Sequence, residues 1–295
     1  MKLEKYLTPE VIAGGLTAVL AALALATREQ RQASGMTGMG VSVRTLNHTA
    51  LLPGTSDKFD GVALAKWCDD NEVRFVELLA CWIDKDSGLS KRYLPPEAAQ
   101  VANELRAAGV KVGIWGWPDP RGDALYRERM TDAFELVGAE WIKHDPERPY
   151  HGAGPYSKAQ RVESAASIME WSTAIAPTDV TSYGSGPKSH PSFVWEPWSK
   201  GARYGRPQWY DKDSDWSPTK VASFAESWKT LFPTLCPILS AVNSNTPQMM
   251  RDEADRFLPV AGGPIFSYWD FYWLAISSAR TAAAAEIGAK YRLGA

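Results

Sequence analysis

The chain has 295 residues, 45% of them hydrophobic and 22% charged, a composition that excludes a largely disordered or collagen-like protein. Its 32 basic and 34 acidic residues give a formal net charge of −2, so no basic excess points to nucleic acid as a partner. The three cysteines, Cys68, Cys81 and Cys236, are too few and too dispersed for a disulfide framework or a CxxC metal site. Tryptophan is unusually frequent, with 13 residues against 9 phenylalanines, and this surplus serves either core packing or sugar stacking.

The first forty residues form a separate segment of the sequence. Residues 11–26 carry no charge and would cover about 24 Å as a helix, which is short for a membrane core of about 30 Å. Three interpretations are open: a retained signal anchor, a cleavable signal ending at Ala24-Leu25-Ala26, and an Ala-rich helix packed against protein. We predict an N-terminal apolar helix and tether over 1–40, with membrane association through residues 11–26, ahead of one domain over 41–295.

From Val41 onward, short apolar or β-branched runs alternate with polar segments of helical pattern, which is typical of βαβ units. The expected strands lie at 41–46, 74–82, 111–117, 140–144, 179–183, 207–210, 237–242 and 264–268. The expected helices lie at 59–71, 95–108, 124–137, 158–174, 220–231 and 247–257. Eight strands with intervening helices over about 250 residues predict a (β/α)8 TIM barrel rather than a doubly wound sheet. No GxGxxG or GxxxxGK[ST] pattern follows any strand, so we expect no cofactor.

Loops that follow the strands build the active site of such a barrel. The expected fourth strand ends in WIKHDPE, and alternation places Lys143, Asp145 and Glu147 on one face. Close carboxyls drive their pKa values apart, leaving one protonated and one ionised, which is what glycoside hydrolysis needs. Lys143 would hold Asp145 ionised or bind a sugar hydroxyl. The alternative is a solvated salt-bridge cluster on a surface loop.

Three other strand ends place aromatic side chains beside a carboxyl. They are Trp115 and Trp117 near Asp119, Trp209 and Tyr210 near Asp211, and Trp269 near Asp270. Sugar rings stack their C–H faces on aromatic rings while carboxylates bind their hydroxyls, so this pairing predicts a carbohydrate cleft. The predicted substrate-binding side chains are Lys143, Trp115, Trp117, Tyr210 and Trp269. The candidate supporting carboxylates are Asp211, Asp270 and Glu77.

Glu77 and the four histidines are the remaining candidates for a functional role. Glu77 lies inside an apolar run and needs a partner if buried, so it belongs either to a network inside the barrel or to the site. The four histidines show no HxH or HExxH spacing, and we expect no metal. His144 alternates with Asp145 and is expected to be a packed histidine on the opposite face.

The same segments resemble the family-25 lysozyme-type muramidases. Asp145-Pro146-Glu147 is similar to the D-x-E at that family's fourth strand, and SYWDFYW is similar to its aromatic last strand. The resemblance implies that Glu147 is the catalytic acid and Asp145 its electrostatic partner. The chain departs from the family at strand one, where Ser42 stands near the position of an acidic residue.

A second resemblance is to the α-galactosidase-like barrels, whose fourth strand ends in K-x-D. Lys143-His144-Asp145 fits that pattern. It implies that Asp145 is a nucleophile and that Asp211 or Asp213 is the acid/base.

An Ala/Gly-rich anchor ahead of such a barrel resembles the signal-anchor endolysins of phages. We therefore expect a glycosidase, membrane-anchored, exported or virion-associated, that cleaves cell-wall polysaccharide such as peptidoglycan. One alternative is an exo-acting α-glycosidase with Asp145 as nucleophile. Another is a catalytically silent barrel that binds carbohydrate or is a structural component of a virion.

Overall fold

The computed structural model describes residues 37–52, 55, 57–83, 90–92, 94–210, 216–241 and 245–291. The predicted apolar helix over 11–26 lies outside these residues, as does Asp211. In the described part of the chain, no helix combines the length and the apolar character that a membrane span needs. The division at residue 40 stays a prediction.

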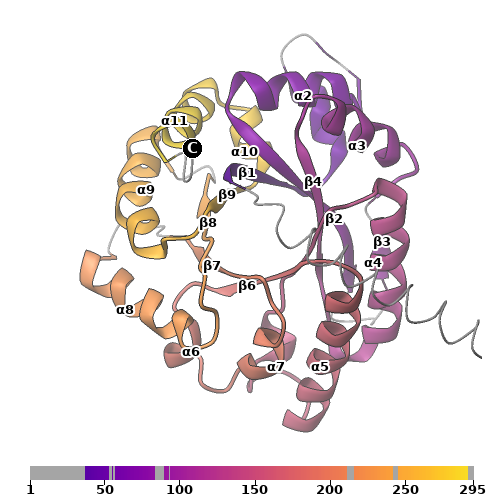
Figure 1. Cartoon of the computed structure of the whole chain (residues 1–295), viewed down its shortest axis with the longest axis vertical. Helices are drawn as coiled ribbons and strands as arrows, with labels where there is room; N and C mark the ends of the chain where they lie inside the picture. Colours follow the sequence, from indigo (N-terminus) through magenta and orange to yellow (C-terminus); the bar gives the residue numbers. More distant parts are fainter. Residues whose placement is uncertain are drawn as a thin grey trace, which may run out of the picture. The chain divides into compact units, whose positions relative to one another are not determined.

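Eight parallel strands form a closed barrel in the described part of the chain (Figure 1). Around the barrel they are β1 (Gly38–Val43), β2 (Val73–Ile83), β4 (Lys111–Trp117), β5 (Ile142–His144), β6 (Thr178–Tyr183), β7 (Tyr204–Trp209), β8 (Ile238–Ser240) and β9 (Ile265–Trp269). The barrel closes because β1 pairs in parallel with both β2 and β9. A short strand, β3 (Ser90–Arg92), adds an antiparallel pairing to the end of β2. The predicted (β/α)8 architecture is confirmed.

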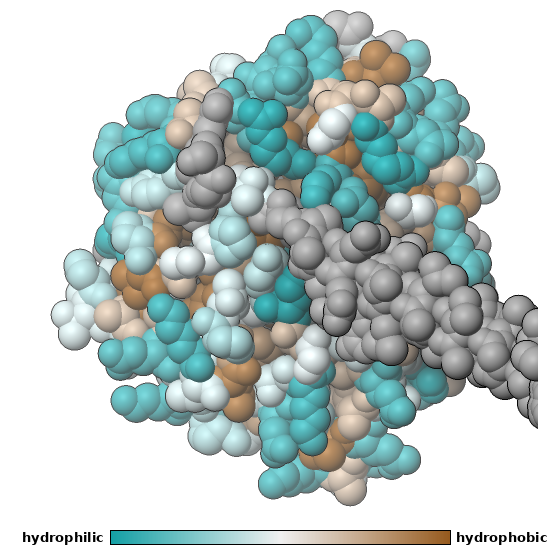
Figure 2. Space-filling view, viewed as in Figure 1, coloured by the Kyte–Doolittle hydropathy of each residue, from teal (hydrophilic) through white to brown (hydrophobic). Residues whose placement is uncertain are grey.

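Helices surround the strands on the outside (Figure 1). The longer ones are α2 (Gly61–Asp70), α3 (Ala98–Ala107), α4 (Asp123–Val137), α5 (Lys158–Ile175), α8 (Pro218–Lys229), α9 (Pro247–Ala261) and α11 (Ser278–Lys290). Their ends follow local chemistry: Ser157 and Gln160 form a reciprocal capping box at the start of α5, and Gly138 ends α4 with a φ of 56°. Hydrophilic side chains cover much of this helical rim in the view of Figure 2.

Strand β1 starts three residues before the predicted one, inside the segment whose composition suggests a tether. The glycine there has a packing role, because a Cβ on Gly40 would lie 2.0 Å from the Phe75 ring. Residues 38–40 are thus part of β1. A glycine-rich stretch has the same composition whether it links domains or allows two strands and a ring to approach closely.

Three short helices occupy segments for which we predicted no helix: α6 (Gly186–Ser189), α7 (Trp195–Ser199) and α10 (Phe271–Ala275). The first two lie in the Pro-rich loop after β6, where Trp195 and Trp198 are 5% and 0% exposed. Burial of these two rings anchors α7 despite the polar surroundings. Helix α11 also follows the last strand without having been predicted.

Tryptophans within the longer helices pack in the core, as predicted. Trp67 and Trp228 are buried, and Trp171 is half-buried against the same cluster. These side chains lie between the barrel and the helices. The tryptophans that can line a site are therefore those at the strand ends.

Candidate active site

A cavity of about 360 Å³ opens at the carboxyl ends of the strands, where barrel enzymes carry their active sites. Its lining comes from the ends of β1, β2, β4, β5, β7 and β9. The lining residues are Arg44, Leu79, Trp82, Trp115, Trp117, Asp145, Glu147, Gln208, Tyr210 and Trp269. Six predicted site residues thus meet in one cavity: Asp145, Glu147, Trp115, Trp117, Tyr210 and Trp269.

Asp145 lies directly after β5 and is 7% exposed. Its backbone N–H donates to the Gly116 carbonyl at 2.9 Å, which continues the pairing of β5 with β4 and turns the side chain inward. Gln208 Nε2 donates to Asp145 Oδ1 at 2.8 Å. Burial, with a contribution from neighbouring Glu147, raises the pKa of Asp145 well above its usual value. The opposing effect of Lys143 is smaller, so the expectation that Lys143 holds Asp145 ionised is not met.

Glu147 lies two residues further along and also faces the cavity. Burial raises its pKa to about 7, against an ordinary value of 4.5, although a hydrogen bond with Gln208 acts in the opposite direction. The Glu147 carboxyl is therefore mainly protonated below pH 7. A carboxyl in this state can donate a proton to a leaving oxygen.

The cavity walls are tryptophan. The Trp82 and Trp117 rings are stacked, with centroids 5.0 Å apart and planes 30° apart. The Trp115 and Trp269 rings meet edge to face, with centroids 5.0 Å apart. Such rings offer flat apolar faces on which a sugar ring can stack.

Four lining residues were missed by the sequence reasoning: Arg44, Leu79, Trp82 and Gln208. Trp82 and Leu79 belong to the long apolar run of β2, whose hydrophobicity does not reveal which end reaches the cavity. Gln208 could have been predicted from the sequence, because it lies two residues before Tyr210 and strand alternation places both side chains on one face. Arg44 follows β1 directly, so its position at a strand end was equally visible.

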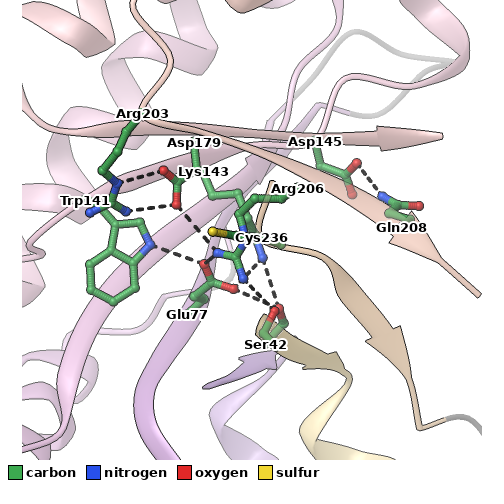
Figure 3. A network of polar contacts seen from close by, with 11 residues as sticks. Ser42, Glu77, Trp141, Lys143, Asp145, Asp179, Arg203, Arg206, Gln208 and Cys236 are labelled. Carbon is green, nitrogen blue, oxygen red and sulfur yellow. Dashed lines mark hydrogen bonds and ion pairs between the residues drawn. The ribbon is translucent and has the colours of Figure 1, made fainter. Parts of the chain in front are cut away.

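Glu77 and Lys143 lie deeper in the barrel, in a buried polar network drawn in Figure 3. Glu77 accepts hydrogen bonds from Arg206, from Lys143 and, at 3.2 Å, from the Trp141 indole. Lys143 Nζ also donates to Ser42 Oγ at 3.0 Å. Neither Glu77 nor Lys143 lines the cavity. The prediction that Lys143 binds substrate is therefore corrected. Lys143 does lie on the same face of the strand as Asp145, as predicted, but its side chain contacts Glu77 in the barrel interior below the cavity.

Burial of Glu77 alone would raise its pKa, but the charges of Arg206 and Lys143 outweigh burial and lower the pKa to about 2. Next to this group, Arg203 donates to both oxygens of Asp179 at 2.9 Å. Each of these five charges thus has a partner of opposite charge. Of the two interpretations of Glu77, the structure supports the network inside the barrel.

Two predicted carboxyls cap helices instead of lining the cavity. Asp270 accepts from the Tyr272 N–H at 2.9 Å at the start of α10, and burial raises its pKa. Asp119 is 1% exposed and accepts from Tyr156 Oη at 2.5 Å. An aspartate directly before a helical turn binds backbone N–H groups, which competes with any role in a cleft.

Two neighbouring aromatic groups are structural. Trp209 is fully buried and donates to the Gly184 carbonyl at 2.9 Å. His144 packs on the opposite face from Asp145, as predicted, with Nδ1 2.9 Å from Tyr126 Oη. Burial lowers the pKa of His144 to about 3. Among the described residues, no group of three or more His, Cys, Asp or Glu is arranged to hold a metal ion.

The fold is shared with (β/α)8 barrel glycoside hydrolases, whose solved structures match most of this chain. One is the Bacillus cereus spore cortex-lytic enzyme SleL, with a TM-score of 0.56 and 10% identity over 86% of this chain and 75% of that one. Another is a GH18 chitinase from Pseudoalteromonas aurantia, with a TM-score of 0.58 and 10% identity over 86% and 100%.

A protein of different description has the same fold. The xylanase and alpha-amylase inhibitor protein XAIP-II from Scadoxus multiflorus has a TM-score of 0.55 and 11% identity over 85% of this chain and 98% of that one. No family model matches the chain, and no curated protein matches it. At these identities the similarity defines the fold, and the activity has to be argued from the cavity.

Proposed function

We propose that this chain is a glycoside hydrolase that cleaves a cell-wall polysaccharide. Glu147 is the acid that protonates the leaving oxygen, and Asp145 supports the oxocarbenium-like transition state. The observation that carries this proposal is the pair of buried carboxyls in a tryptophan-walled cavity at the carboxyl end of the barrel. A surface salt-bridge cluster, the alternative interpretation of WIKHDPE, would be solvated, whereas Asp145 is 7% exposed.

The pKa of Glu147 supports the acid role. An ordinary glutamate is ionised at neutral pH and cannot donate a proton, whereas a carboxyl with a pKa of about 7 is protonated in half of the molecules at that pH. The stacked Trp82 and Trp117 rings support a sugar as the substrate. Together they favour glycoside hydrolysis over other acid-catalysed reactions.

The substrate class rests on the neighbours and on the sequence. A cortex-lytic enzyme and a GH18 chitinase share the fold, which favours a wall polysaccharide such as peptidoglycan or chitin. Within this proposal, the resemblance of Asp145-Pro146-Glu147 to muramidases favours peptidoglycan and an endolysin-like role. Export or membrane anchoring through residues 11–26 belongs to the same proposal.

The alternative enzyme uses the same carboxyl of Asp145. An exo-acting α-glycosidase needs ionised Asp145 as nucleophile, and the electrostatic role proposed here also needs the ionised form, so the raised pKa of Asp145 does not distinguish the two enzymes. A catalytically silent barrel is favoured by one observation, the shared fold of the inhibitor protein XAIP-II. That reading predicts glycan or protein binding without turnover.

Product analysis separates these readings. The purified chain is incubated at pH 6 with peptidoglycan, chitin oligosaccharides and a panel of aryl α-glycosides, and products are identified by mass spectrometry. We expect fragments with new reducing ends from the wall polysaccharides, lost in Glu147→Gln and kept in Glu128→Gln, a matched change at an exposed glutamate of α4. Cleavage of aryl α-glycosides alone would establish the alternative enzyme, and no cleavage of any substrate would overturn the proposal.

A further inference from the structure

Arg44 is a cation at the cavity that the proposed reaction does not use. It follows β1 directly, is exposed, and lines the same cavity as Asp145 and Glu147. Within the described part of the chain, Arg44 forms no ion pair with a carboxylate. The side chain of Asp270, whose pKa it influences, is held by the backbone of α10 instead.

The Arg44 guanidinium lies over the ring of Trp82. Its Cζ lies 5.6 Å from the centroid of the Trp82 ring, and Trp82 stacks in turn on Trp117. A cation–π contact uses the face of the guanidinium and leaves the N–H donors at its edge free. Those donors lie in one plane, in the fork geometry that matches the two oxygens of a carboxylate.

The other charged groups near the cavity do not cancel the attraction of the Arg44 charge for an anion. Burial raises the pKa of both Glu147 and Asp145, so the two carboxyls repel an anion less than ordinary carboxylates would. Lys143, whose charge acts on Asp145, is 1% exposed and bound to Glu77. An anion entering the cavity therefore meets Arg44 as its available cationic partner.

We propose that Arg44 binds a carboxylate on the sugar chain, so that the cavity selects a glycan with an acidic substituent over its neutral counterpart. This inference rests on the proposed function and narrows its substrate. In a wall polysaccharide the carboxylate has two sources: the lactyl group of a muramic acid residue whose peptide has been removed, and C6 of a uronic acid.

Binding measurements test the inference without relying on turnover. Calorimetry on the Glu147→Gln protein compares peptide-free peptidoglycan strands with the same strands after methyl esterification, and oligouronates with their methyl esters. We expect the free acids to bind about tenfold or more tightly than the esters, because a charge-assisted bidentate contact is lost on esterification. A preference confined to one of the two pairs identifies the source of the carboxylate.

Variants of Arg44 assign the preference to this residue. Arg44→Gln should abolish the ratio between acid and ester affinities, and Arg44→Lys should keep part of it, since lysine supplies a charge without the fork. The control is Arg251→Gln, which removes the same charge from a residue paired with Glu286 on the helical rim and should keep the full ratio. Equal binding of acid and ester, no binding of any form, or an unchanged ratio in Arg44→Gln would overturn the inference.

Failure of the two proposals can be told apart. If the unmodified chain cleaves none of the polysaccharides but the Glu147→Gln protein still prefers free acids through Arg44, the catalytic proposal fails and the carboxylate site stands. If cleavage occurs at equal rates on acids and esters, the catalytic proposal stands and the role of Arg44 fails.

Discussion

Gln208 at the end of β7 donates a 2.8 Å hydrogen bond to Asp145 after β5, spanning β6 between them. The same amide interacts with Glu147, and its effect is to lower the pKa of both carboxyls. Burial raises both values further than Gln208 lowers them. Gln208 therefore limits how far the pKa values of the two carboxyls rise above their ordinary values.

Replacing Gln208 with leucine should move the pH dependence of activity. Loss of a donor to the ionised carboxyl raises the pKa of Glu147 further. The acid form of Glu147 is the active one, so activity falls as pH rises through this pKa, and the falling limb should move to higher pH in Gln208→Leu. The measurement is kcat/KM from pH 5 to 9. A limb that stays in place or moves to lower pH would contradict the role of Gln208.

The Glu147→Gln protein should be more stable than the unmodified chain at pH 8. The folded-state pKa of Glu147 is about 7, above the ordinary 4.5, so its contribution to stability is full below about pH 4.5 and is lost as pH rises through 7. Glutamine does not ionise and should gain about 3 kcal/mol at pH 8, with little difference at pH 4. Thermal unfolding at both pH values measures this, and equal Tm values at pH 8 would contradict the raised pKa.

Removing the carboxyl of Glu77 should strongly destabilise the fold. Glu77→Ala leaves Arg206 and Lys143 buried without their shared partner, which costs about 3–5 kcal/mol. The matched exposed pair is Lys66 with Asp70, whose side chains are 74% and 53% exposed, and Asp70→Ala should cost about 1 kcal/mol or less. Urea unfolding gives both values. Similar losses in the two variants would show that the buried network is dispensable.

The same network has a pH signature. Because the pKa of Glu77 is lowered to about 2, its stabilising contribution is present above the ordinary pKa of 4.5 and is lost as pH falls toward 2. The stability difference between the unmodified chain and Glu77→Gln should therefore shrink between pH 5 and pH 2. A difference that is constant over this range would be inconsistent with the lowered pKa.

Trp117→Ala should weaken glycan binding with little loss of stability. Trp117 is half-buried at the cavity, and loss of one stacking face should raise Kd about tenfold. Trp198→Ala is the comparison, because that ring is fully buried away from the cavity and its removal should cost about 3–5 kcal/mol of unfolding free energy. Binding to the Glu147→Gln protein and thermal unfolding separate the two effects. Unchanged binding in Trp117→Ala would show that Trp117 does not contact the glycan.

Much of the barrel was predictable because its strands are apolar runs bounded by polar helices. The predicted strand 111–117 coincides with β4, and the predicted start of α5 at residue 158 is that of the structure. Short helices such as α7 escaped prediction because tertiary burial of Trp195 and Trp198, rather than helix propensity, holds them. The helix after β9 was missed because Asp270 reads as part of an aromatic strand, although it caps α10.

The site was predictable as far as strand alternation reaches. Alternation places Lys143 and Asp145 on the inner face, but depth within the barrel decides that Asp145 lines the cavity while Lys143 joins the layer below. Gln208 and Arg44 come from other strands, and their convergence on Glu147 depends on the closure of the barrel. No local pattern encodes that convergence.

The central claim is that Glu147 donates the proton that breaks a glycosidic bond. The most direct measurement is the release of reducing ends from peptidoglycan and chitin oligosaccharides at pH 6 by the unmodified chain, by Glu147→Gln and by Glu128→Gln, with Tm measured on each protein. We predict release by the unmodified chain and by Glu128→Gln, and a loss of about a hundredfold or more in Glu147→Gln without loss of Tm. Full activity of Glu147→Gln would contradict the assignment.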